Sequence, residues 1–142
     1  MKEINLAEVE QVAHILAKKM MMWNEPIPDF GTRYPNILES CLQTPFQKFA
    51  KRNLYKGLLG KVSILFYLMI KNHPFQNGNK RIAMTTVFYF LYKNDKWILV
   101  DNQQLYNFAK WVAESSPDVR NETVAAIEKF FKKYLVEAEV DK

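Results

Sequence analysis

Residues 73–81 contain the side chains of this sequence best suited to chemistry on a phosphate, in the order His-Pro-Phe-Gln-Asn-Gly-Asn-Lys-Arg. A neutral imidazole such as that of His73 can take a proton from an attacking hydroxyl near neutral pH. Lys80 and Arg81 add two cations, and a guanidinium can donate two parallel hydrogen bonds to phosphate oxygens. The segment therefore predicts in-line attack by a hydroxyl on a nucleotide phosphorus, with the protein supplying position and charge stabilisation.

Two apolar runs flank this segment and predict the helices that hold it. Residues 58–72 are apolar nearly all round, and residues 80–93 have the same character, as expected for helices surrounded by protein. Polar groups buried between such helices are costly unless they are paired, so a ligand is expected among them. Gly78 and Asn79 begin the second helix, where unpaired N–H groups and the helix dipole favour phosphate binding.

The rest of the chain predicts further helices and one short hairpin. Apolar spacing predicts an amphipathic helix from Asn5 to Met22, in which Asn5 and Glu8 form a capping box. Proline and glycine predict a loop over 26–35. The alternation Phe46, Gln47, Lys48, Phe49 predicts a small β-hairpin within residues 45–55. Three more helices are expected at 37–42, 102–114 and 118–136, with a brief extended piece at 97–100.

Composition predicts a single cytoplasmic domain of residues 1–142. The chain is 49% hydrophobic, which is enough for one compact core that needs no disulfide or structural metal. The lone Cys41 cannot form an intrachain disulfide, and no secretory leader is recognisable at the start. The most apolar run, residues 58–70, is broken by Gly60 and Lys61 and is shorter than the ~20 residues that a bilayer requires, so no membrane association is expected.

Residues 73–81 resemble the Fic/Doc signature H-P-F-x-D/E-G-N-G/K-R, with agreement at eight of nine positions when the free position is counted. The resemblance extends through residues 31–33, 38–40, 45–47 and 54–55, and downstream to about residue 114. It implies a compact all-α bundle with a small β-hairpin flap. It also implies that His73 is the general base, that Gly78, Asn79, Lys80 and Arg81 handle the phosphates, and that Phe75 anchors the loop. Arg81 is thereby both a catalytic and a nucleotide-binding candidate.

The hairpin at 45–55 is the candidate for the flap that the resemblance implies. Such a flap pairs with an extended stretch of the target protein and holds its hydroxyl near the base. The residues assigned to this docking role are Phe46, Gln47, Lys48 and Phe49.

Two positions favour the death-on-curing (Doc) branch of this family. Lys80 stands where adenylyl-transferring members have glycine, and Met84 stands where they commonly have a second arginine. The resemblance implies a toxin-type enzyme that moves a phosphate from ATP onto a hydroxyl of a target protein, which the Doc branch places in the translation machinery. The alternative within the family is protein adenylyl transfer (AMPylation). The self-inhibitory pattern S/T-x-x-x-E-G/N is absent from both ends of the sequence, so a separate antitoxin protein is expected.

Asn77 departs from the family pattern, because it replaces the acidic residue that holds magnesium. An amide oxygen can ligate Mg²⁺ but brings no negative charge. Mg²⁺ is expected from the resemblance, yet Asn77 puts metal binding in doubt and leaves open a weakened enzyme or a Fic-fold binding module.

A basic nucleic-acid-binding domain is the main alternative from another class, since the net charge is +5. The helix after the motif is apolar on all sides, which argues against direct nucleic-acid binding. Lys51 and Arg52 are interpreted as a loop charge pair, with target binding as the alternative. His14 and Cys41 are interpreted as structural residues, as are the Met20–Met22 run and the aromatic residues at 88–92.

Overall fold

The computed structural model describes residues 1–20 and 25–138. The helical elements are α1 (Leu6–Glu8), η1 (Val9–Ala13), α2 (His14–Met20), η2 (Phe30–Thr32), α3 (Pro35–Gln43), η3 (Thr44–Phe46), α4 (Gly57–Lys71), α5 (Asn79–Lys93), α6 (Asn102–Glu114), η4 (Pro117–Val119) and α7 (Arg120–Tyr134). The strands are β1 (Lys48–Phe49), β2 (Arg52–Asn53), β3 (Lys96–Ile98) and β4 (Leu135–Glu137). They form two antiparallel hairpins, β1 with β2 and β3 with β4.

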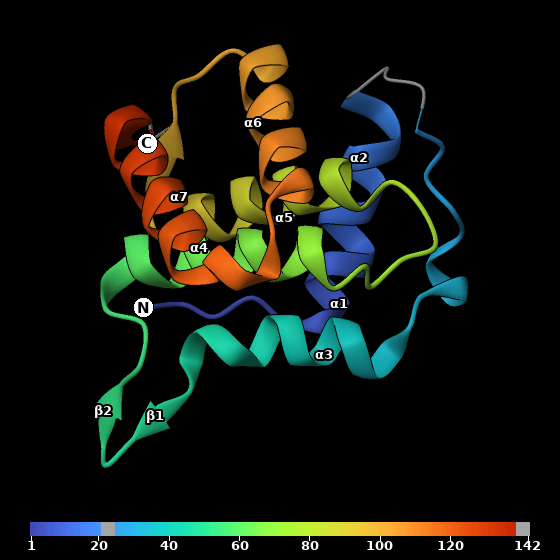
Figure 1. Cartoon of the computed structure of the whole chain (residues 1–142). Coiled ribbons are helices and arrows are strands. Elements are labelled where there is room, and N and C mark those ends of the chain that lie inside the picture. Colours follow the sequence, from blue (N-terminus) through green and yellow to red (C-terminus); the bar gives the residue numbers. More distant parts are fainter. Residues whose placement is uncertain (21–24, 139–142) are drawn as a thin grey trace.

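Helices α4 and α5 form the centre of the bundle, as their apolar sequences predict. In Figure 1, α3 runs below this pair, α1 and α2 lie at one side, and α6 and α7 cover the upper and opposite sides. The largest fully buried side chains include Phe66, Met69, Ile82 and Phe90 from α4 and α5, with Phe131 from α7. The predicted all-α class is confirmed. Within the described residues, no helix is both long and apolar enough to cross a membrane.

The first helix differs from the prediction by a wider turn in its middle. The capping box is present, because Asn5 Oδ1 accepts a hydrogen bond from the Glu8 amide and the Glu8 side chain accepts one from the Asn5 amide. A π-type turn then follows at η1. Val9, Ala13 and Ala17 are fully buried at four-residue intervals, and a wider turn keeps such a series on one face. Residues 21 and 22, which the prediction included, lie outside the described residues.

The end of the chain corrects a second prediction. The helix expected at 118–136 begins as η4, continues as α7 and ends at Tyr134. Residues 135–137 instead form β4, which pairs with β3 so that Trp97 lies opposite Val136. The partner strand lies about 40 residues earlier, so local propensity could not reveal it. Helix α3 also begins at Pro35, two residues before the predicted start, since proline suits the first turn of a helix.

Cys41 is a buried core residue, as predicted. It is 0% exposed, and burial raises the pKa of its thiol to about 12. A thiol with so high a pKa carries almost no thiolate at neutral pH, so Cys41 does not act as a nucleophile.

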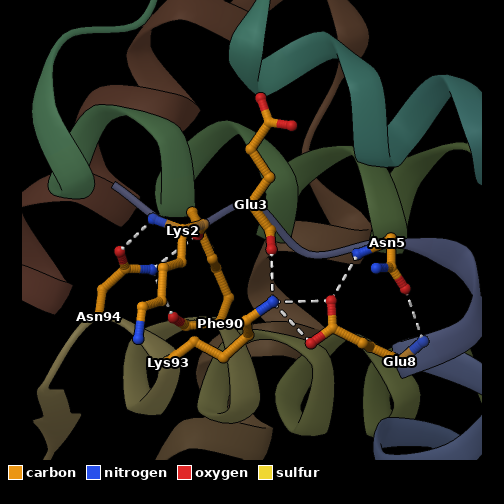
Figure 2. A network of polar contacts seen from close by, with 7 residues as sticks. All are labelled: Lys2, Glu3, Asn5, Glu8, Phe90, Lys93 and Asn94. Atoms are coloured by element: carbon orange, nitrogen blue, oxygen red, sulfur yellow. Dashed lines mark hydrogen bonds and ion pairs between the residues drawn. The ribbon is translucent and has the colours of Figure 1, made fainter.

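A polar network fastens the N-terminal segment to the end of α5 (Figure 2). The Lys93 ammonium group pairs with both carboxylate oxygens of Glu8, at 2.6 and 2.7 Å, and donates to the Glu3 carbonyl at 2.7 Å. Asn94 exchanges two hydrogen bonds with the Lys2 backbone. Burial alone would raise the pKa of Glu8, but the hydrogen bonds from Lys93 and the Asn5 amide outweigh it and lower that pKa. The carboxylate is therefore held ionised across the junction.

We expect Lys93→Met to lower the free energy of unfolding by about 1–3 kcal/mol, because Glu8 would lose a charge-assisted partner in a half-buried site. Lys96→Met is the matched control. It removes the ion pair with Glu137, whose side chain is 75% exposed, and should cost less than ~0.5 kcal/mol. Urea unfolding of both variants measures the difference. Equal losses would contradict a special role for the Glu8–Lys93 junction.

Candidate active site

The loop between α4 and α5 begins with a strained histidine. Helix α4 ends at Lys71 with Asn72 as its C-cap, and His73 follows at φ +51°. This left-handed conformation favours glycine after a helix, and another residue there stores of order 1 kcal/mol of strain. The His73 side chain is exposed, while the next two residues, Pro74 and Phe75, are buried. The fold thus places an exposed imidazole at a position where glycine would adopt the backbone conformation with less strain.

The Asn79 side chain holds the loop closed by contacting both His73 and Phe75. Asn79 Oδ1 accepts from the Phe75 amide at 3.0 Å, and Nδ2 donates to the Phe75 carbonyl at 2.9 Å. Nδ2 also lies 3.4 Å from His73 Nδ1. An amide nitrogen can only donate, so this contact places the lone pair of a neutral imidazole on Nδ1 and its proton on Nε2. At 3.4 Å the contact is weak, which lets the exposed ring turn or exchange tautomer.

Phe75 anchors the loop in an aromatic cluster, at 1% exposure. Its ring centroid lies 5.7 Å from that of His14 and 5.9 Å from that of Phe30. His14 is 3% exposed and its Nε2 lies 2.8 Å from the Pro28 carbonyl, to which it donates. Burial lowers the pKa of His14, which keeps the ring neutral. His14 is therefore structural, as predicted, and it ties residues 28–30 to the loop.

Residues 25–34 lie directly against the motif loop. Gly78 adopts φ +71°, and a Cβ added there would stand 2.5 Å from Ile27 Cδ1 and 3.1 Å from the Pro26 carbonyl oxygen. Only glycine fits this close approach. The Tyr34 amide donates to the Pro74 carbonyl at 2.9 Å, which fixes the other end of the same segment. Gly78 is the N-cap of α5 and makes no side-chain cap, so the first N–H groups of that helix face this junction uncapped.

The two motif cations already have protein partners in this arrangement. Lys80 Nζ lies 2.6 Å from Glu25 Oε1. Arg81 is 5% exposed, and its Nη1 and Nη2 donate to the carbonyls of Glu25 and Ala17, each at 2.5 Å. Arg81 Nε is buried and has no hydrogen-bond partner among the described residues. Burial lowers the pKa of Arg81, although Glu25 opposes that shift.

Glu25 contacts both motif cations, a contact that the sequence did not predict. Besides Lys80, it faces Tyr106 of α6, whose pKa is raised to about 12 by burial and by the Glu25 carboxylate. A signal was present in the sequence, because residues 40–94 contain no Asp or Glu. The counter-ions of Lys80 and Arg81 therefore had to come from outside that stretch.

The structure places the predicted docking hairpin far from His73. The hairpin exists, as predicted, with Lys48 and Phe49 in β1. It precedes the first residue of α4, whereas the motif loop follows the last, and a 15-residue α-helix is about 22 Å long. Figure 1 shows the hairpin projecting at the lower left and the motif loop at the opposite side. The structure thus brings together residues 73 and 77–81, and places residues 25–34, not 46–49, beside them.

The described residues do not fit a protein-held magnesium site at Asn77. Its side-chain oxygen already accepts from the Gly78 amide at 2.8 Å, and it carries no charge. No group of three or more His, Cys, Asp or Glu residues that could hold a metal occurs in the described parts of the chain. One oxygen of the nearby Glu25 carboxylate, Oε1, is engaged by Lys80.

Comparison with known families identifies the class of protein to which this fold and loop belong. The Fic/DOC family matches residues 4–91, which is more than half of the chain, and the chain belongs to that family. Its members are typically nucleotide-transferring enzymes that act on protein targets and are often paired with antitoxins. No curated protein and no solved structure matches the chain.

We expect His73→Gly to raise the free energy of unfolding by about 1 kcal/mol over His73→Ala, because glycine adopts φ +51° without strain. Thermal and urea unfolding of the two variants provide the measurement. If His73→Gly were the less stable of the pair, the strain assigned to this position would be absent.

Proposed function

We propose that this Fic/DOC protein transfers a phosphate from ATP to a hydroxyl of a target protein, with His73 as the general base. The observation that carries the proposal is the Asn79 side chain, which joins an exposed imidazole to the uncapped start of α5. A proton acceptor and an anion-binding helix end thereby lie on one rigid loop. If His73 and the start of α5 lay far apart on the surface, a binding module would be the better proposal.

The proposed reaction is a direct in-line transfer. The target hydroxyl oxygen forms a bond to the γ-phosphorus, the bond from that phosphorus to the β,γ-bridging oxygen breaks, and ADP leaves. His73 takes the hydroxyl proton on the nitrogen that carries its lone pair, after the ring has left the weak contact with Asn79. Lys80 and the first N–H groups of α5 stabilise the charge on the phosphoryl oxygens.

Arg81 contributes mainly from a buried position. Its two Nη groups hold the carbonyls of Ala17 and Glu25, so it positions residues 25–34 beside the loop. The buried Nε, which lacks a partner among the described residues, is the atom that suits a phosphate oxygen. We propose that Arg81 both positions this segment and binds phosphate, while the close backbone approach at Gly78 is taken up by Pro26 and Ile27.

Phosphate transfer ranks above adenylyl transfer because of two side chains. Lys80 fills and charges the space that glycine leaves open in adenylyl-transferring members. Met84 is 0% exposed and packs in the core, so this position adds no second cation. We further propose a cytoplasmic protein with a target in the translation machinery and a separate antitoxin.

The deciding experiment incubates the protein with ATP labelled at either the α or the γ phosphate, in an extract of cells of the organism that encodes it. We expect label from the γ position on a target protein, abolished by His73→Ala and retained by Gln76→Ala, which alters the exposed free position of the motif. Label from the α position would replace phosphate transfer by adenylyl transfer. No label from either position would favour the binding-module alternative.

We expect Glu25→Gln to bind a non-hydrolysable ATP analogue about tenfold more tightly, since a phosphate would no longer compete with a carboxylate for Lys80. The backbone carbonyl of Glu25 would still hold Arg81. Asp29→Asn is the matched control, because it neutralises another acid of the same segment. Isothermal titration calorimetry measures both. A gain shared by the control would point to overall charge and not to Glu25.

A further inference from the structure

The positive charge of this protein is concentrated beside and within the β1–β2 hairpin. Residues 45–61 contain five cations and no acidic residue: Lys48, Lys51, Arg52, Lys56 and Lys61. The other 15 basic residues equal the 15 acidic residues in number, so this stretch accounts for the whole net charge of +5. A local excess of this kind attracts an acidic partner more strongly than the same charge spread over the surface.

Four of these cations are unengaged in the described parts of the chain. The side chains of Lys48, Lys51, Arg52 and Lys56 are exposed and make no ion pair or hydrogen bond there. Lys61 differs, because it is 5% exposed and donates to the Tyr55 carbonyl. By contrast, the exposed or half-buried Lys80, Lys93 and Lys96 each pair with a carboxylate. The hairpin cations are thus available to a second molecule.

The turn of the hairpin keeps a cation at its tip against backbone preference. Ala50 and Lys51 both have positive φ, at 50° and 65°. A two-residue turn of this kind strongly prefers Asn-Gly, and non-glycine residues in it cost of order 1 kcal/mol each. Phe49, next to this turn, is 75% exposed. Strain, charge and an exposed aromatic ring therefore meet at the part of the molecule that projects farthest in Figure 1.

A hollow of about 670 Å³ lies along the base of the hairpin. Its lining includes Phe46, Lys48, Asn53 and Lys61, and Glu3 is the single carboxylate among the lining residues. Burial lowers the pKa of Lys61, the charge of Lys48 lowers it further, and both side chains line this hollow. An apolar residue of a partner can enter here while its carboxylates meet the flanking lysines.

We propose that the hairpin surface, formed by Lys48, Phe49, Lys51, Arg52 and Lys56, binds an acidic segment of another protein in extended conformation. Carboxylates pair with the cations, an apolar side chain packs on Phe49, and the outer strand edges offer N–H and C=O groups to a peptide backbone. Backbone N–H and C=O groups along a strand edge pair with the backbone of another peptide, which a nucleic acid lacks. The exposed edges therefore favour a peptide over RNA as the partner. The surface lies one helix length from His73, so this binding is independent of the transfer chemistry.

Protection of the edge against aggregation is the simpler explanation for lysines on a short strand. That explanation accounts for Lys48 but not for the strained Lys51 or for Phe49, since an exposed aromatic ring on the same strand promotes association. Edge protection and peptide binding predict different results, because only a binding surface would bind an acidic peptide more tightly than other probes.

Fluorescence anisotropy with a labelled acidic peptide tests the proposal. The probe has about 12 residues that alternate Glu with Val, so that carboxylates and apolar side chains fall on opposite faces of a strand. We expect Lys51→Glu/Arg52→Glu to weaken binding at least ~10-fold, and Phe49→Ala to weaken it about threefold. The matched control, Lys132→Glu/Lys133→Glu on α7, lowers the net charge from +5 to +1 just as the hairpin variant does. It should lose less than ~3-fold.

Three outcomes would overturn the proposal. Equal losses in both charge-reversed variants would mean that only the overall field attracts the peptide. A single-stranded RNA of equal length that binds more tightly than the peptide at physiological salt would assign the surface to nucleic acid. The absence of peptide binding by the unaltered protein would leave edge protection as the role of the lysines. Circular dichroism checks that each variant is folded, and the labelled-ATP assay reports separately on transfer.

Discussion

The arrangement of the motif loop depends on the side-chain amide of Asn79. The loop carries the Phe75 backbone into the core, where its N–H and C=O groups need partners. One amide satisfies both groups and still reaches the His73 ring. The buried phenyl ring then fixes where the loop sits, and the helix end that follows keeps its N–H groups uncapped. Loss of the Asn79 amide would leave the buried N–H and C=O groups of Phe75 unpaired, and it would also remove the contact that holds the His73 ring.

Charge distribution explains why segments distant in sequence converge on this loop. With no acid from residue 40 to residue 94, the central helices must draw counter-ions from elsewhere in the fold. Glu8 forms an ion pair with Lys93 at one end of α5, and Glu25 forms one with Lys80 at the other end. These pairs bind the N-terminal quarter of the chain to α5. The Glu25 pair also means that any incoming phosphate meets a cation already neutralised by a carboxylate.

Helix α4 separates two surfaces of different chemistry. At its end lies the loop with an imidazole and a helix N-terminus, and before its start lies a basic hairpin with an exposed aromatic ring. A rigid helix of this length prevents either surface from influencing the other by direct contact. A substitution on the hairpin should therefore leave the motif loop unchanged, as would not be the case for a flap that closed over His73.

The sequence by itself determined the helical class, the capping box at Asn5, the buried α4 and α5, the motif loop and the family, because these rest on local periodicity and on contiguous residue types. It also placed a hairpin within residues 45–55. Only the tertiary structure decided that this hairpin lies away from His73, that residues 25–34 cover Gly78, and that residues 135–137 leave the helix to pair with β3. Each of these depends on contacts between residues far apart in the chain, for which local propensity carries no information.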